Sequence, residues 1–155
     1  MNRRRTLGVA ALVAVLALGI FNSAVWATTP TGQHASGLVT GTLSAATQVN
    51  TDRIKFQTKG PVDVAMFTVT YDAGGFSGWH THPGVLFVLV VSGAVVRTVG
   101  CESVTYSAGQ TFVESDEQPS GEVRNASATE PAVLEVAQIV PKDSGRRVEG
   151  DPPSC

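Results

Sequence analysis

Hydrophobic and polar positions along this chain alternate over short segments, and turn residues separate these segments. The clearest case is 62–71, "VDVAMFTVTY", which is rich in β-branched and aromatic residues. Similar or shorter candidate strands are 38–43, 53–57, 85–91, 94–99, 103–106, 111–114, 121–126 and 132–140. Turn signals such as Gly60-Pro61 and Gly74-Gly75 lie between them. Short strands with turns every 8–12 residues predict an all-β sandwich or barrel.

The segment 85–91, "VLFVLVV", is apolar at every position. A strand with one face in water alternates, so this strand is expected to be covered on both faces. One face would fill the interior of the barrel. The other would lie under an N-terminal strand or in the interface of a homodimer, and the sequence leaves these alternatives open.

The first 27 residues have the features of a secretory signal peptide. Arginines at 3–5 form a positive region, and an uncharged run follows at 7–21. This run is short for a membrane-spanning helix, which needs about 20 apolar residues. Val25 and Ala27 lie where small residues precede a cleavage site, which predicts cleavage after Ala27. An uncleaved N-terminal anchor is the alternative. A cleaved signal implies a secreted, periplasmic or cell-envelope protein.

The predicted mature chain has a single-domain length and divides into three parts. Residues 28–37, "TTPTGQHASG", are small and polar and are expected to form a linker. Residues 38–140 contain the predicted strands of the barrel. Residues 141–155, "PKDSGRRVEGDPPSC", are rich in Pro and Gly and are expected to form an extended tail.

The charge of the mature chain limits its partners. Of the 11 Lys and Arg residues, three lie in the signal segment, which leaves eight against 13 Asp and Glu and a net charge near −5. Nucleic acids and anionic membrane surfaces attract clustered positive charge. The mature chain has one local basic pair, Arg146-Arg147. We therefore expect neither nucleic acid nor, after signal cleavage, a membrane as partner.

The two cysteines, Cys101 and Cys155, are expected to form a disulfide. Exported proteins enter compartments in which disulfides persist, and an even count without a Cys-x-x-Cys spacing favours a bridge over a metal or redox site. The bridge would close a loop of about 55 residues and pin the tail to the domain, which contributes roughly 3–4 kcal/mol by chain entropy. Two free thiols are the alternative.

Two of the three histidines lie in the segment 74–84, "GGFSGWHTHPG". Residues i and i+2 of a strand point to the same face, so His80 and His82 are expected to project side by side. Such a pair of imidazoles can hold a divalent metal from two points. Hydrogen bonding to neighbours and water is the alternative role. The third histidine, His34, lies in the predicted linker and is not expected to take part. The residues expected to share the inward face of the pair are Gly84, Leu86, Val88 and Val90.

This segment resembles the first motif of the cupin superfamily, which runs Gly, five residues, His-x-His, three or four residues, Glu, six residues, Gly. Gly74, His80, His82 and Gly93 fit it in register. The sequence before the motif, the cysteine after it and the ending "RRVEGDPPSC" are similar to small exported cupin-2 proteins of actinobacteria. The resemblance covers about residues 38–155 and implies a jelly-roll barrel of two antiparallel sheets. It implies no single activity, because cupins include dioxygenases, isomerases, decarboxylases, sugar-binding regulators and storage proteins.

The chain departs from the cupin pattern at two ligand positions. Leu86 stands where the first motif has a glutamate. Gly121, four residues before Asn125, stands where the second motif has a histidine. The matched ligands are therefore reduced to His80 and His82, whereas catalytic metal sites generally use three protein ligands.

A third ligand would have to come from a position that the family does not use. Glu114 and Gln118 are the best candidates. Glu114 lies where the sheet re-enters the second motif, and Gln118 lies in the loop beside the missing histidine. Asp116 and Glu117 lie in the same loop, and strand alternation is expected to turn Glu122 away. A solvated acidic loop is the alternative interpretation of "ESDE" at 114–117.

These residues predict a secreted cupin with a reduced two-histidine site that holds Mn, Fe, Ni or Zn weakly or with a third ligand. In an enzyme, such a metal would act as a Lewis acid or an oxygen-activating centre on a small molecule in the barrel. The alternative is a metal-free cupin that binds a small ligand or serves as a structural protein.

The chain has no Gly-x-Ser-x-Gly elbow and no phosphate loop. Arg97 and Arg124 are expected to face solvent, with contact to an anionic ligand as the alternative. Whether the protein is catalytic stays open.

Overall fold

The computed structural model of the protein describes residues 28–116 and 119–155. The predicted signal peptide and two residues of the acidic loop, Glu117 and Gln118, lie outside the described residues. All regular structure in the described part is β-strand. Within these ranges no helix is long and apolar enough to cross a membrane.

The strands follow one another along the chain with short connections. They are β1 (Thr31–Leu43), β2 (Gln48–Asn50), β3 (Lys55–Gln57), β4 (Val62–Phe76), β5 (His80–Thr81), β6 (Val85–Ser92), β7 (Ala94–Val99), β8 (Glu102–Ser107), β9 (Thr111–Glu114), β10 (Gly121–Asn125), β11 (Ala132–Pro141) and β12 (Val148–Glu149).

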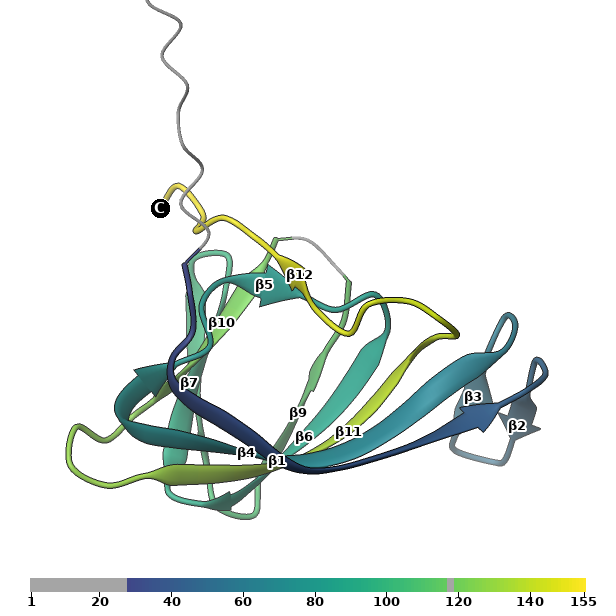
Figure 1. The fold of residues 1–155 in the computed structure, drawn as a ribbon, viewed down its shortest axis with the longest axis horizontal. Helices are drawn as coiled ribbons and strands as arrows, with labels where there is room; N and C mark the ends of the chain where they lie inside the picture. Colours follow the sequence, from purple (N-terminus) through teal and green to yellow (C-terminus); the bar gives the residue numbers. More distant parts are fainter. Residues whose placement is uncertain (1–27, 117–118) are drawn as a thin grey trace, which may run out of the picture.

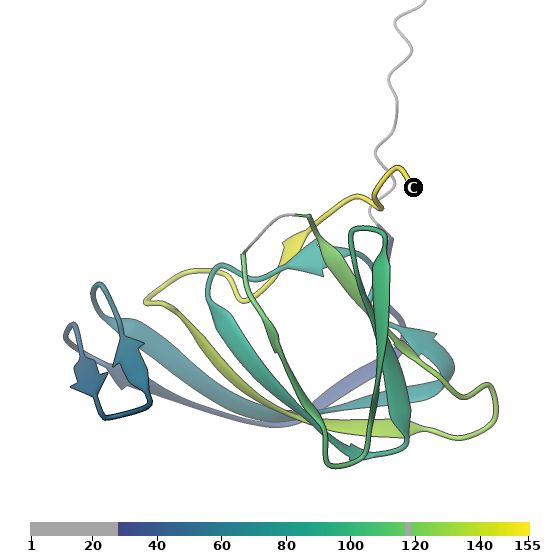
Figure 2. The same ribbon diagram turned by 180° about the vertical axis from the view of Figure 1, so that it is seen from behind.

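Ten of these strands form one antiparallel sheet that curls into a nearly closed barrel (Figure 1). The central order is β12-β5-β10-β4-β11-β6-β9, with β1 paired to β4 and the β7–β8 hairpin paired to β10. The view from behind shows this hairpin on the wall of the barrel (Figure 2). The hairpin β2–β3 forms a separate small sheet beside the barrel. The predicted all-β barrel is confirmed.

The two layers expected of a jelly roll are joined into one sheet by β4. This strand pairs with β11 from Val62 to Tyr71, and its last residue, Phe76, pairs with Arg124 of β10. A strand of 15 residues can take part in both layers because it bends from one to the other. The alternation over residues 62–71 predicted only the part of β4 that pairs with β11.

The chain is already a strand at Thr31, inside the segment 28–37 that was expected to be a linker. Most of this part of β1 is exposed, and its polar residues pair with polar residues of β4, as in His34 with Thr70 and Ser36 with Thr68. A strand on the surface of a barrel does not need apolar residues, so its composition resembles that of a linker.

The core lies inside the barrel and follows the predicted alternation of β6. Leu86, Val88 and Val90 are at most 3% exposed. They pack with inward residues from the other strands, namely Val69, Tyr71, Val95, Phe112, Val123, Ala132, Leu134 and Val136. The inward face predicted for His80 and His82 is therefore confirmed as the barrel interior.

The opposite face of β6 is not covered by any described residue. Val85, Phe87, Leu89 and Val91 are 38–50% exposed. The strand β1 pairs with β4 instead, and β4 and β11 separate it from β6. The expected cover by an N-terminal strand is therefore absent from the described part of the chain.

Candidate metal centre

The histidine pair lies at the rim of the barrel on the short strand β5 and the residue after it. His80 and His82 are 7% and 8% exposed, and their ring centroids are 4.8 Å apart. The chain then passes close to β11 at Gly84, where a Cβ atom would lie 2.0 Å from the carbonyl oxygen of Ile139. Only glycine permits this approach, and it directs β6 into the barrel immediately after the histidines.

Backbone carbonyls determine which nitrogen of each ring carries the proton. His80 Nδ1 lies 2.8 Å from the carbonyl oxygen of Gly78, and His82 Nδ1 lies 2.6 Å from that of Arg146. A carbonyl oxygen can only accept, so each Nδ1 must be protonated and donate. In a neutral imidazole the other nitrogen, Nε2, then keeps its lone pair. This arrangement is typical of histidines that ligate a metal.

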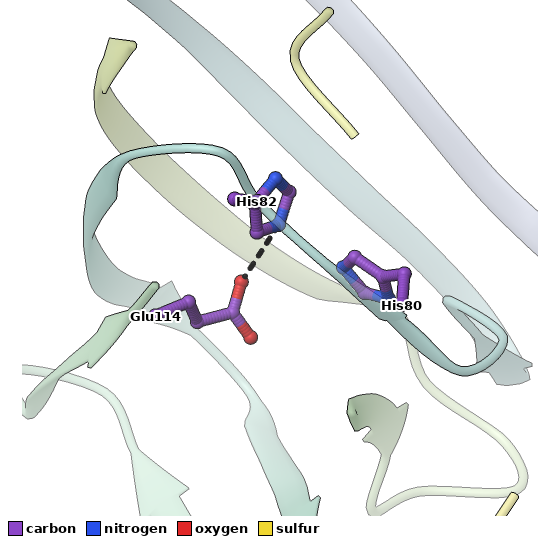
Figure 3. A group of neighbouring side chains, drawn as sticks. All are labelled: His80, His82 and Glu114. Carbon is purple, nitrogen blue, oxygen red and sulfur yellow. Dashed lines mark ion pairs between the residues drawn. The ribbon is translucent and has the colours of Figure 1, made fainter. Parts of the chain in front are cut away.

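A carboxylate faces the histidine pair from the neighbouring strand β9. Glu114 is directly opposite Leu86 in the β6–β9 register. Its Oε2 atom lies 3.3 Å from His82 Nε2, and the ligand atoms of His80, His82 and Glu114 lie within 4.8 Å of one another (Figure 3). Leu86 stands where the first motif has a glutamate. The neighbouring strand β9 thus presents a carboxylate directly opposite this position.

The contact between His82 and Glu114 lacks a proton donor in the neutral state. His82 Nε2 has no hydrogen-bond partner among the described residues, despite the 3.3 Å distance. With Nδ1 protonated, the lone pair of Nε2 and the carboxylate are two acceptors that face each other. A cation between them, either a proton or a metal ion, would satisfy both, so this donor set fits a divalent metal.

Burial sets the charge of the groups at the centre. Burial lowers the pKa of His80 to about 4, an effect that Glu114 partly opposes. The ring is therefore neutral near pH 7 and its lone pair is available. Burial alone would raise the pKa of Glu114, but the adjacent His82, His80 and Arg97 hold it below its usual range. Glu114 is therefore anionic at neutral pH.

Arg97 on β7 lies beside Glu114 and does not face solvent, contrary to the expectation. Its side chain is 23% exposed, and its Nε atom lies 3.5 Å from Glu114 Oε1. The guanidinium is also 5.6 Å from the ring centroid of Phe112. Arg124, in contrast, is half exposed, covers the ring of Phe76 and pairs with Glu122.

The remaining candidates lie elsewhere. Asp116 is exposed, and the pairing of Glu122 with Arg124 keeps it out of the group, as alternation indicated. Gln118 and Glu117 lie outside the described residues, so the predicted role of Gln118 is not tested. His34 is exposed and pairs with Asp72 on β4.

Gln138 on β11 is a site residue that the sequence analysis missed. It is 1% exposed, its Nε2 donates to the carbonyl oxygen of Arg146 over 2.6 Å, and its Oε1 has no partner among the described residues. Its register partner is Leu86, which places it beside the centre. The sequence feature that could have identified Gln138 is a single amide at an inward position of the predicted strand 132–140.

An apolar cavity extends from the centre into the barrel. Its volume is about 430 Å³, and His80, His82 and Glu114 form part of its wall. The rest of the lining is mainly aliphatic and aromatic and includes Phe67, Tyr71, Leu86, Phe112 and Leu134. On its other side the centre borders a second cavity of about 460 Å³, which Arg97 also lines.

Residues 67–137 match the family model described as "Cupin domain". This chain is a cupin-domain protein. The matched segment holds the histidine pair, Glu114 and both departures from the cupin motifs, Leu86 and Gly121. A search of curated proteins finds no match to the chain.

Several solved structures are similar to this cupin-domain protein. A recombinant oxalate oxidase in complex with glycolate is 23% identical, with 56% of this chain and 45% of that chain covered and a TM-score of 0.46. A cupin-2 domain protein from Rhodospirillum rubrum is 15% identical over 59% of this chain and 57% of that one, with a TM-score of 0.47. A conserved protein with a double-stranded β-helix domain from Klebsiella pneumoniae is 17% identical over 57% and 75%, with a TM-score of 0.47. The cupin-domain protein thus spans less than half the length of the oxalate oxidase.

Proposed function

We propose that this protein is an exported cupin that binds one divalent transition metal through His80, His82 and Glu114. The two imidazoles supply Nε2 and the glutamate supplies a carboxylate oxygen. The adjoining apolar cavity would receive a small ligand beside the metal. Mn, Fe, Ni and Zn are all compatible with such a mixed nitrogen and oxygen donor set.

The observation that carries this proposal is the convergence of lone pairs at one point. Backbone carbonyls accept from both Nδ1 atoms, which leaves one lone pair on each ring, at Nε2. His82 Nε2 lies 3.3 Å from the anionic carboxylate of Glu114, and the three residues each offer a ligand atom within 4.8 Å of the others. Buried polar groups normally have a partner, and a converging set of acceptors is satisfied by a cation. Three protein ligands leave at least one coordination position for water or for a ligand from the cavity.

The metal would supply Lewis acidity to a molecule bound in this position. The chain itself would hold the two imidazoles in one tautomer, keep Glu114 ionised and exclude bulk water with the apolar lining.

A second candidate function is metal-free binding of a small ligand. The observation that favours it is the apolar cavity of about 430 Å³, whose lining does not require a metal. In that case His82 would be protonated and would form an ion pair with Glu114. The two candidate functions therefore differ in which cation, a metal ion or a proton, lies between His82 Nε2 and the Glu114 carboxylate.

Elemental analysis of the protein without a histidine tag separates these candidates. We expect close to one equivalent of transition metal per chain. His82→Ala and Glu114→Gln should lower metal affinity by at least 100-fold, since even loss of a group that only orients a ligand costs about 10–100-fold. Glu122→Gln is the matched control, because this glutamate lies on the adjoining β10 and pairs with Arg124. It should retain the metal.

Either of two results would contradict the metal proposal. One is a protein without metal that also takes none up on titration with Zn²⁺, Mn²⁺, Ni²⁺ or Fe²⁺. The other is equal metal content in the wild type, His82→Ala and Glu114→Gln. Both results would support the metal-free candidate.

Export is the second part of the proposal. The Cys101–Cys155 disulfide supports it, because such bridges persist in oxidising compartments. Mass spectrometry of the protein from culture medium and cell fractions should find a mature chain that begins at Thr28. A chain that retains residue 1 and stays in the cytoplasm would contradict export.

A further inference from the structure

We propose that the C-terminal tail positions His82, so that metal affinity depends on the Cys101–Cys155 disulfide. This inference rests on the proposed metal site. It assigns to the backbone carbonyl of Arg146 the role of orienting a ligand, and to the disulfide the role of keeping that carbonyl in place. Arg146 is a positioning residue and would not itself touch the metal.

The carbonyl oxygen of Arg146 is the point at which the tail meets the centre. It lies 2.6 Å from His82 Nδ1 and also 2.6 Å from Gln138 Nε2. It thereby fixes the tautomer and the ring orientation of His82, and the buried Gln138 holds it in place from β11. An outer partner of this kind sets the direction in which a ligating histidine points its lone pair.

The two histidines differ in where this partner comes from. His80 donates to Gly78, two residues away in the same turn. His82 donates to a residue 64 positions further along the chain. The orientation of His80 is therefore local, whereas that of His82 exists only while the tail lies on the barrel rim.

The tail is attached along the rim by a series of short contacts (Figure 1). The strand β12 pairs with β5, with Val148 opposite Thr81 and Glu149 opposite His80. Beyond it, Gly150 N donates to the carbonyl oxygen of Trp79 over 3.0 Å. Ser120 Oγ donates to the carbonyl oxygen of Asp151 over 2.7 Å. A ladder of two residues is weak without further support.

The disulfide supplies that support at the far end of the tail. Cys155, the last residue, is bonded to Cys101 at the turn between β7 and β8. The segment with Arg146 and β12 is thus held at both ends, by β11 before it and by the disulfide after it. Without the bond, the tail would be held at one end only, and local opening would release the Arg146 carbonyl.

The test is a comparison of metal affinity with and without the bond. Zn²⁺ binding is measured by chelator competition for the wild type and for the double variant Cys101→Ser/Cys155→Ser. We expect a 10- to 100-fold loss of affinity, which is typical when the partner of a ligating histidine is lost. Lys142→Ala is the control on the same tail, and because this exposed side chain pairs with Asp143 away from the centre, its affinity should match that of the wild type.

A second measurement separates positioning from a general loss of structure. Nitrogen-15 NMR of the metal-free protein reports the tautomer of each histidine. In the double variant we expect His82 to lose its fixed Nδ1–H tautomer while His80 keeps its own, because Gly78 is local. Should the double variant fail to fold, Gln138→Leu serves in its place. It keeps the disulfide, removes one of the two donors to the Arg146 carbonyl and should also weaken Zn²⁺ binding.

The outcomes are distinguishable from those of the metal proposal. If the wild type binds no metal, the proposed function fails and this inference fails with it. If the wild type binds Zn²⁺ and the folded double variant binds it equally well, only the role of the tail is overturned. Loss of the tautomer at both histidines would also overturn it, since the effect would then not be specific to His82.

Discussion

At the scale of single residues, the register of β6 and β9 decides which side chains face the histidine pair. Leu86 and Glu114 are opposite each other in the β6–β9 ladder and both point into the barrel. Directly opposed residues have Cβ atoms about 5 Å apart. A carboxylate on either strand can therefore reach the same point between the histidines.

This geometry predicts that the carboxylate can be exchanged between the strands. Glu114→Leu should abolish metal retention, and the double variant Leu86→Glu/Glu114→Leu should restore at least a tenth of the wild-type affinity. The measurement is chelator competition with Zn²⁺. Leu86→Glu alone places two carboxylates at one point and is expected to lower stability in the absence of metal. No recovery in a folded double variant would show that the position on β9 is specifically required.

Metal binding should also stabilise the folded chain. A ligand at 100 times its dissociation constant adds about 2.7 kcal/mol to the free energy of unfolding when it binds the folded state alone. We expect Zn²⁺ to raise the melting temperature of the wild type and a chelator to reverse the rise. His80→Ala should show no shift with Zn²⁺, as measured by calorimetry. An equal shift in this variant would indicate binding elsewhere.

At the scale of elements, the outer face of the sheet presents an apolar row that crosses five strands. The row is formed by register partners from β1, β4, β11, β6 and β9, namely Val39, Met66, Ala137, Phe87 and Val113. Four of these side chains are 46–69% exposed, and Val85, Leu89 and Val91 extend the row along β6. Seven side chains exposed to this degree offer on the order of 500 Å² of apolar surface, which is large for a monomer.

We expect a second copy of the chain to cover this row. Two copies would bury on the order of 1,000 Å² in total, which is about the minimum for a biological interface. Val113→Asp should shift the protein from dimer to monomer in light scattering after size-exclusion chromatography. Val104→Asp is the matched control, since Val104 on β8 is 52% exposed and Val113 is 49% exposed. A monomeric wild type, or equal effects of both variants, would contradict this interface.

At the scale of the whole molecule, the disulfide closes the fold around the long loop from Cys101 to Cys155. The two residues are separated by 54 positions. By chain entropy such a bridge contributes roughly 3–4 kcal/mol to the free energy of unfolding. Cys101→Ser/Cys155→Ser should lose about this amount in urea unfolding of the metal-free protein. An unchanged midpoint would show that the bridge does not contribute to stability.

Much of this architecture could be predicted from the sequence. Alternation and turn residues located most of the strands, because burial of one face requires apolar residues at every second position. The same rule placed His80 and His82 on the inward face. It failed for residues 31–37 and for the short strands β2 and β12. Their side chains are mostly exposed, so their pairing leaves little trace in the pattern of apolar and polar residues.

The candidate metal centre could be predicted only in part. The histidine pair is contiguous, so its spacing alone predicts a shared direction. Glu114 was one of two candidates for the third ligand, and its distance from His82 depends on the register of β6 and β9. Gln138 was not anticipated, since a single inward amide in an apolar strand has no recognisable spacing.

The sequence by itself determined the all-β class, the cupin motif, the two missing family ligands and the one pairing available to its two cysteines. Each of these depends on local pattern or on residue identity. Tertiary structure alone decided that Glu114 faces the histidines, that Arg97 lies beside it and that the carbonyl of Arg146 holds His82. These contacts join residues far apart in the chain, and their distances are fixed by strand register and by the path of the tail over the barrel rim.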